Sequence, residues 1–393
     1  ERVERVVVRS DRYTTVEIRL EPDTGSTIEL DPVTAVANAA TEETQLRIRQ
    51  QAAAVQDAVS AEEMSRSPDS SAGAAVRRVV AATLVDGQFL FVRGLGGRYT
   101  SVLLNQVPLP SLDPDIPGAG LDLIPAGLLE SIAVRKTFTP DMLGAFAGGS
   151  MLITTRAFPD RFQLRLGLST GLGTETTFRS VLRDPSGEVD FLGFDGGHRA
   201  LPSEVPAERV EIGLDDMGAE EIEAIGESFP NSWTYDRALG LPSLGLSAAV
   251  GDTVSLLGRP FGYLLSLSYG VSTSRRTGSS AAVRLEGEEE QSELAVRERL
   301  EVETGSTTAR WGALGTASLE LTDDDTLSLV ALWAHSGTES VRLVSGFSES
   351  EGADIESRRL QWVERDLAFV QVLGEHRGMP IVDGASLEWR LDT

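Results

Sequence analysis

Residues 261–271 read FGYLLSLSYGV, and large apolar side chains recur at every second position of this stretch. Successive side chains of a β-strand point to opposite faces of its sheet, so a period of two indicates a strand. One face would carry Tyr263, Leu265, Leu267, Tyr269 and Val271. The other face would carry Ser266, Ser268 and Gly270, and Leu264 is the one large apolar residue out of phase.

The same alternation returns in four other stretches after Pro159, at 162–169, 244–250, 316–321 and 386–391. Polar or small residues fill the second face of each stretch. A polar face repeated over many strands is typical of a water-filled or plugged barrel lumen, not of the dry core of a β-sandwich. Aromatic residues stand at or near strand ends, where a membrane-interface girdle would place them: Phe261, Tyr263, Trp333 and Trp389.

The connections between these strands alternate in length. Short turns are expected at 256–260, 323–326 and 376–384, and long segments at 173–242, 277–311 and 338–357. Outer-membrane barrels join their strands by short periplasmic turns and long outer loops. We therefore predict a partial transmembrane β-barrel over residues 160–393. A soluble all-β domain with long insertions is the alternative, although loops of this length are uncommon in compact soluble domains.

Composition excludes several classes of function. The net charge of −25 argues against nucleic-acid binding, which needs a basic surface. Cysteine is absent, which removes disulfides, thiolate catalysis and cysteine–metal sites. The segment 173–242 holds 15 acidic and 5 basic residues, which disfavours a strongly anionic ligand.

Residues 51–159 predict a small α+β domain with many glycine and proline turns. Short strands are expected at 88–94 (QFLFVRG) and 148–156 (GGSMLITTR), and 121–136 predicts a short helix followed by a strand. Apolar residues at helical spacing between 75 and 84 predict another helix. Residues 1–22 are expected to be the final strands of a β-sandwich, and 23–50 a linker.

Two stretches carry a family resemblance: FVRGLGGRYTSVLLNQVPLPS at 91–111, and LDLIPAGLLESIAVRKTFTPDMLGAFAGGSMLITTRAFP at 121–159. They resemble the plug of TonB-dependent receptors, in the subgroup with an N-terminal carboxypeptidase-regulatory-like β-sandwich. Residues 55–71 resemble the opening helix of that plug, and FLGFDGGHRALP at 191–202 is similar to a segment that follows the first barrel strand. Gln106 departs from the family pattern, which has glycine there.

The resemblance implies a mainly β protein: an α+β plug followed by the first strands of an antiparallel barrel of about 22 strands when complete. About seven strands are predicted here, so we expect the chain to be the N-terminal part of such a receptor. It would lie in the bacterial outer membrane as a multi-pass barrel with a periplasmic N-terminus, in contact with lipid.

Residue roles follow from the same resemblance. Arg93 would lock the plug to carboxylates on the barrel wall, for which Glu320, Glu364 and Glu388 are candidates. Two apical plug loops would contact substrate through Arg98, Tyr99, Asp113 and Asp115, although plain solvation of these loops explains them equally well. The extended segment IELDPVTAV (28–36) is the candidate TonB box, with Ile28, Glu29, Leu30 and Val33 pairing with TonB by strand addition.

No catalytic residue, metal or cofactor is expected. His198, His335 and His376 are far apart in the sequence and are interpreted as structural. The glycines at 94, 96 and 97 lack the helix and Gly-Lys-Ser/Thr signature of a phosphate loop, so they are interpreted as turns. The acidic runs at 288–290 and 323–325 are interpreted as solvated faces.

The expected function is uptake of a scarce or bulky ligand, a siderophore, vitamin, glycan or peptide, energised by TonB with ExbB and ExbD. The chain is not expected to be an enzyme, because no bond of the substrate breaks. The alternative is a receptor or scaffold on the same fold that serves signalling, export or a surface complex, with an accessory lipoprotein as a possible partner. A soluble carbohydrate-binding β protein is a third reading.

Overall fold

The computed structural model describes residues 46, 49–50, 52, 54–67, 71–85, 88–111, 118–140, 142, 148–185, 187, 189–197, 199–206, 218–230, 232–286, 293–377 and 386–393. The chain divides into two compact units, Glu1–Ala37 and Asn38–Thr393, and every described residue belongs to the second. None of the helices in the described part of the chain has the length and apolar character needed to cross a membrane.

The first part of this unit is an α+β domain, which we call the plug, built on a five-stranded sheet in the order β1-β6-β7-β4-β5. Its strands are β1 (Gln56–Ser60), β4 (Thr100–Leu104), β5 (Val107–Pro108), β6 (Leu129–Arg135) and β7 (Gly149–Thr155). Only β4 and β7 run parallel among the described strands. A hairpin of β2 (Ala82–Val85) and β3 (Phe89–Val92), the helices α2 (Ala61–Arg66) and α3 (Ala72–Val76), and the 3-10 turns η1 (Gly97–Tyr99) and η2 (Ala126–Leu128) complete it.

Two helices expected from the sequence are shorter than predicted. Residues 55–71 begin as strand β1, because Val59 is buried opposite Ile132 of β6. Helix α2 starts only at the next turn, where the Ser60 hydroxyl accepts a hydrogen bond from the amide of Glu63 at 3.2 Å. The helix expected over 75–84 ends at Val76, and residues 82–85 pair with β3 instead.

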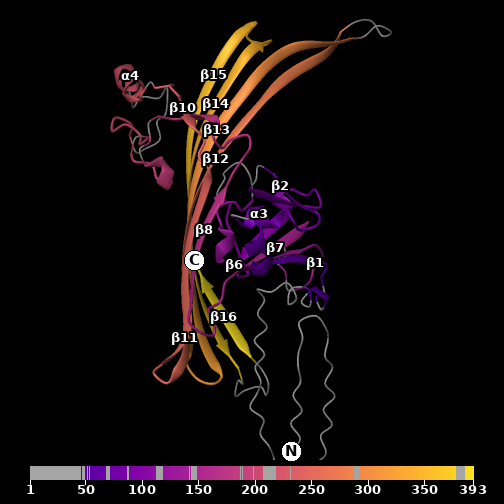
Figure 1. Ribbon diagram of the computed structural model, residues 1–393, viewed down its shortest axis with the longest axis vertical. Helices are drawn as coiled ribbons and strands as arrows, with labels where there is room; N and C mark the ends of the chain where they lie inside the picture. The colour runs from indigo at the N-terminus through magenta and orange to yellow at the C-terminus, as the bar shows by residue number, and fades with distance from the viewer. Residues whose placement is uncertain are drawn as a thin grey trace, which may run out of the picture. The chain divides into compact units, whose positions relative to one another are not determined.

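A seven-stranded antiparallel sheet follows, in the order β16-β15-β14-β13-β12-β11-β8, and its long strands run side by side in Figure 1. The strands are β8 (Gln163–Gly171), β11 (Ser243–Leu256), β12 (Arg259–Glu286), β13 (Glu293–Glu320), β14 (Asp325–Ser348), β15 (Ala353–His376) and β16 (Leu387–Asp392). The mainly β architecture with a plug and part of a barrel is confirmed.

The prediction of long loops at 277–311 and 338–357 is wrong. Strands β12 and β13 have 28 residues each, and β14 and β15 have 24 each, so most of these segments is paired strand. The sequence hid this because these extensions are polar on both faces, as in STSRRTGSS at 272–280. Without an apolar face there is no period of two to detect, although the backbone hydrogen bonds form regardless.

The two faces of this sheet have different partners. On the face that contacts the plug, the plug face, Leu264, Leu314, Leu332 and Leu367 join one apolar core with plug residues such as Leu128. The contact explains why Leu264 breaks the alternation of its strand, since it faces the plug.

The opposite face, the outer face, exposes leucines in the half of the strands nearer the short turns. Leu166 is 76% exposed and Leu265 is 58% exposed, as a lipid-facing band requires. Tyr263 and Tyr269 bracket this band on β12, about 20 Å apart at the usual rise of a strand.

Beyond that band the outer face is covered by the connection between β8 and β11. This outer segment contains β9 (Ser180–Arg183), η3 (Asp190–Leu192), α4 (Ala219–Ser228) and β10 (Asp236–Leu239), and β9 pairs with β10. The segment expected as a free outer loop is thus in part anchored to strands β12 to β14.

Candidate functional site

The plug is joined to the barrel wall by a buried ion pair between Asp122 and Arg365. The two nitrogens Nη2 and Nη1 of Arg365, on β15, donate to Oδ2 and Oδ1 of Asp122 at 2.6 and 3.3 Å. The Nη1 group also donates to Oε1 of Gln88 in the plug at 2.8 Å. The side chains of Arg365 and Asp122 are only 15% and 8% exposed, so this bidentate pair is largely withdrawn from solvent.

A second arginine lies at the same level of the wall. Arg310 of β13 is on the plug face, where it pairs with Ser336 of β14, and Ser336 pairs with Arg365. The Nε atoms of Arg310 and Arg365 are buried with no hydrogen-bond partner among the described residues. The plug thus sets one carboxylate, Asp122, against a wall that carries two arginines at one register.

A tight turn makes a second contact between plug and wall. Asn105 and Gln106 join β4 to β5 with φ angles of +47° and +72°, a conformation that glycine adopts most easily. The Oδ1 of Asn105 accepts the amide of Thr155 at 3.0 Å. On the wall side, Arg390 donates to the Gln106 side chain at 2.6 Å, and Gln371 donates to the Asn105 carbonyl at 3.3 Å.

Gln106→Gly tests why this position departs from the family pattern. Glycine should relieve about 1 kcal/mol of left-handed backbone strain and should remove one exposed hydrogen bond of similar worth. We expect the melting temperature of the receptor to change by no more than a few degrees, while hydrogen exchange at the β4–β5 turn accelerates because Arg390 no longer holds it. Arg390→Gln should accelerate exchange in the same way. Unchanged exchange in both variants would contradict this contact.

The residues predicted to lock plug and wall lie elsewhere. Arg93 ends β3 at φ +54°, is exposed, and its side chain has no ion pair within the described part of the chain. Glu320 is exposed at the end of β13 beside a short turn. Glu364 is on the outer face, where it accepts from the amide of Asp195 at 3.2 Å. Glu388 pairs with Arg390, the residue that contacts Gln106, and so supports the wall only indirectly.

The structure describes only some of the remaining predicted site residues. Arg98 and Tyr99 form the exposed 3-10 turn η1, and the carbonyl of Tyr99 accepts the amide of Gly148 at 2.8 Å. Asp113 and Asp115 lie outside the described residues, as do Ile28, Glu29, Leu30 and Val33 of the candidate TonB box. The substrate and TonB roles of all eight residues remain predictions.

A clamp that sequence reasoning missed holds the outer segment to the outer face. Arg199 pairs with Asp190, Asp184 and Asp195 at 2.8, 3.1 and 3.1 Å, and its guanidinium lies 4.8 Å from the ring centre of Trp362 on β15. The sequence places three carboxylates within 16 residues of Arg199, which was a signal for an ion-pair cluster. Sequence spacing alone does not show that all three contact the same guanidinium.

His335 is the second part of this clamp. It is fully buried in the middle of β14, where Nδ1 lies 2.9 Å from Oδ1 of Asp366 and Nε2 lies 2.7 Å from the carbonyl of Gly193. Phe194 stacks on its ring with centres 4.2 Å apart.

Glu364 also approaches His335, so these two residues and Asp366 form a group that could hold a metal ion. Both ring nitrogens already face oxygen atoms, and no lone pair can turn to an ion without breaking one of these contacts. The donor set therefore fits a structural clamp better than a metal centre.

Comparison with known proteins identifies the first domain. Residues 47–151 match the family model of the TonB-dependent Receptor Plug Domain. This match confirms, for these residues, the resemblance to a receptor plug that was drawn from the sequence. The N-terminal subgroup assignment concerns residues 1–22, which lie outside the described residues.

Several solved outer-membrane receptors match this chain at low sequence identity and low TM-score. A mutant of the ferric enterobactin receptor PfeA from Pseudomonas aeruginosa is 14% identical with a TM-score of 0.36, covering 91% of this chain and 50% of that one. FpvA of P. aeruginosa bound to an iron pyoverdine complex gives 10% and 0.30, covering 87% and 52%. The unliganded ferric citrate transporter FecA gives 10% and 0.34, covering 91% and 61%. This chain thus spans about half the length of the first two receptors. No curated protein has a matching sequence.

Proposed function

We propose that this chain, whose residues 47–151 are a TonB-dependent receptor plug domain, takes part in active uptake of a scarce or bulky ligand across the bacterial outer membrane. The plug blocks the lumen at rest. Ligand binds above it, an extended N-terminal segment pairs with TonB, and force transmitted through that segment remodels the plug. ExbB and ExbD energise TonB, and no bond of the ligand is broken.

The observation that carries this proposal is the way the plug is held against the wall. Its apolar core is continuous with leucines of four wall strands, yet among the described residues its polar attachment is concentrated at Asp122 with Arg365 and at the turn of Asn105 and Gln106. Few polar contacts confined to two places can be broken without unfolding the plug sheet. Such an attachment suits a part that must move under force and return.

The competing proposal is a receptor or scaffold that serves signalling, export or a surface complex, with a lipoprotein lid as its partner. The outer segment gives this proposal its one specific support, because it carries exposed apolar side chains such as Phe178, Leu201 and Trp233. Import does not require that surface.

The uptake proposal is tested by TonB binding and by transport in the same cells. The complete receptor should bind the periplasmic domain of TonB, and deletion of residues 28–36 should abolish that binding. Cells that express the receptor should accumulate radiolabelled citrate only with intact TonB and with residues 28–36 present. A substitution that removes four charges in α4, Glu220, Glu221, Glu223 and Glu227 to Gln, is the matched control and should leave both readouts unchanged. Binding of TonB that survives the deletion would reject residues 28–36 as the TonB box.

A further inference from the structure

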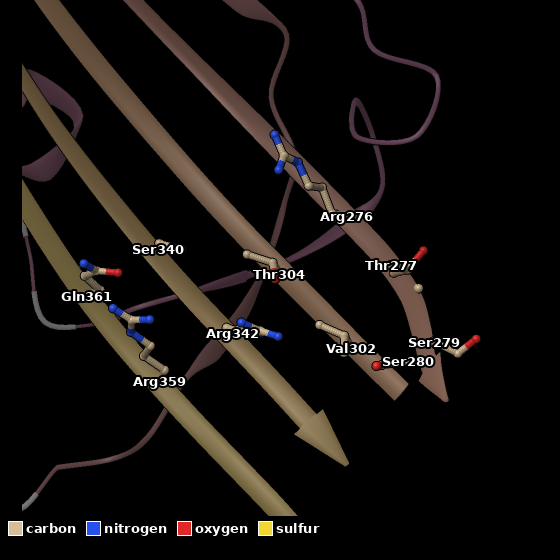
Figure 2. A pocket seen from close by; sticks show the side chains of 11 residues that line it. Arg276, Thr277, Ser279, Ser280, Val302, Thr304, Ser340, Arg342, Arg359 and Gln361 are labelled. Carbon is tan, nitrogen blue, oxygen red and sulfur yellow. The ribbon is translucent and has the colours of Figure 1, made fainter. Parts of the chain in front are cut away.

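We propose that the plug face of strands β12 to β15 binds a small polyanionic ligand through a row of arginines, and this inference rests on the proposed role as a receptor. The row lies at one register across four neighbouring strands. Arg276 pairs with Thr304, Thr304 with Arg342, and Arg342 with Arg359. Figure 2 shows these side chains on adjacent strands around one groove.

The groove stands apart from the plug attachment. Arg359 is six residues from Arg365 on β15, and Thr304 is six residues from Arg310 on β13, which corresponds to about 20 Å along each strand. Going from Arg365 to Arg359, and from Arg310 to Thr304, leads away from the short turns. A ligand in the groove would therefore sit above the plug.

The arrangement of like charges is costly without a ligand. Arg342 and Arg359 are directly opposite each other in an antiparallel pair, where like charges destabilise a sheet. Neither they nor Arg276 makes an ion pair in the part of the chain that the structure describes. Adjacent arginines on the outer face do have carboxylate partners: Arg275 donates to Glu303 at 3.1 Å, and Arg358 pairs with Glu356.

Charge is segregated between the two faces of these strands. Strict alternation places five arginines on the plug face, at 276, 310, 342, 359 and 365, and no carboxylate between 262–282, 300–318, 326–348 and 353–371. Within these ranges the acids, among them Glu303, Glu339, Glu364 and Asp366, fall on the outer face, and the plug-face acids Glu298, Glu320 and Glu375 lie beyond them toward the strand ends. In a chain of net charge −25 this segregation produces a positive surface where a ligand would enter.

The acidic segment 173–242 does not oppose such a ligand. Three of its described acids, Asp184, Asp190 and Asp195, are bound to Arg199 on the outer face, on the far side of the sheet from the groove. The sequence-based argument against an anionic ligand assumed that this segment faces the ligand, and the fold removes that assumption.

The lining indicates the chemistry of the ligand. The groove has a volume of about 510 Å³, in the range of small-molecule sites. Around the arginines it offers neutral hydrogen-bonding groups, Ser280, Thr304, Ser340 and Gln361, with Val302 as its one apolar side chain. Guanidinium groups pair with carboxylate and phosphate in two parallel hydrogen bonds, so the ligand carries at least two such groups. Neighbouring strands lie about 5 Å apart, which is the backbone spacing of Arg342 and Arg359. Arg276 and Arg359 are three strands apart, at about 14 Å.

Binding of citrate and of tripolyphosphate to the complete receptor in detergent tests the proposal by calorimetry at low salt. Arg342→Gln and Arg359→Gln should each weaken binding by about tenfold or more, the worth of a hydrogen bond to a charged group. Arg358→Gln is the matched control on the outer face and should leave binding unchanged. Maltotriose, a neutral probe, should not bind in the groove. The two anions separate a carboxylate preference from a phosphate preference.

Two further measurements, melting temperature and TonB binding, distinguish a loss of anion binding from misfolding and from a loss of import. Because each substitution removes a like-charge contact, Arg342→Gln and Arg359→Gln should not lower the melting temperature. Both variants should still bind TonB. A wild-type receptor that binds the anions but not TonB would reject import and leave the anion site standing. Wild-type receptor that binds neither anion, or equal weakening by Arg358→Gln, would overturn the anion site.

Discussion

Asparagine in place of Asp122 is expected to loosen the plug more than glutamine in place of Arg365. Asp122→Asn leaves Arg365 without its carboxylate and with Arg310 two strands away at the same register, and breaking a buried ion pair costs about 3–5 kcal/mol. Arg365→Gln leaves Asp122 with Arg310 still near it, so we expect a smaller cost of about 1–3 kcal/mol. Hydrogen exchange of the β6 and β7 amides in the intact receptor measures this difference.

The double variant Asp122→Asn with Arg365→Gln isolates the pair. If the two residues act through each other, the double variant should lose less than the sum of the two single losses. Lys136→Gln, which breaks the buried pair of Lys136 with Asp57 inside the plug, is the control. It should destabilise the plug without coupling to Arg365. Additive losses for Asp122 and Arg365 would contradict their direct interaction.

This attachment also marks the limit of what the sequence could predict. Alternation in the chain gives the face on which a residue lies, and it placed Leu265 and Leu267 outward as the structure has them. Alternation cannot show which two distant residues come into contact, and Asp122 and Arg365 are 243 positions apart in the sequence. The family resemblance predicted an arginine on the plug and carboxylates on the wall, whereas the ion pair found here has its carboxylate on the plug and its arginine on the wall.

The candidate site was hidden for a related reason. The row of Arg276, Arg342 and Arg359 is distributed over three strands, and each arginine has ordinary polar neighbours in its own stretch. Only the register between strands brings them to one level. Arg342 lies in a strand extension that was predicted as the loop 338–357, because a strand with two polar faces has no apolar period, and Arg276 and Arg359 lie just outside the predicted loops.

Gly337→Ala is the second substitution with a large expected effect, and it acts on the outer face alone. A Cβ atom at position 337 would lie 2.1 Å from the carbonyl oxygen and 2.6 Å from the Cα of Gly193. These are backbone atoms, so no side-chain rotation can make room. Gly193 must move, and the carbonyl that faces His335 moves with it.

The lifted segment should become open to protease. Trp311 would lose its hydrogen bond of 2.8 Å to the carbonyl of Leu192, and His335 would lose its partner at Gly193. Overpacking costs about 1–3 kcal/mol, which raises the population of the lifted segment by the corresponding factor. Cleavage by trypsin after Arg199 should therefore accelerate on the order of five- to a hundredfold.

Gly315→Ala on β13 is the matched control, since its Cβ would meet only Leu265 Cδ2 at an ordinary 3.5 Å. It should leave the cleavage rate unchanged. Because the plug contacts the opposite face, hydrogen exchange of β6 and β7 should be unaltered in Gly337→Ala. Equal cleavage rates in wild type and Gly337→Ala would show that the outer segment is not held by this close approach, and altered plug exchange would show that the two faces of the wall are coupled.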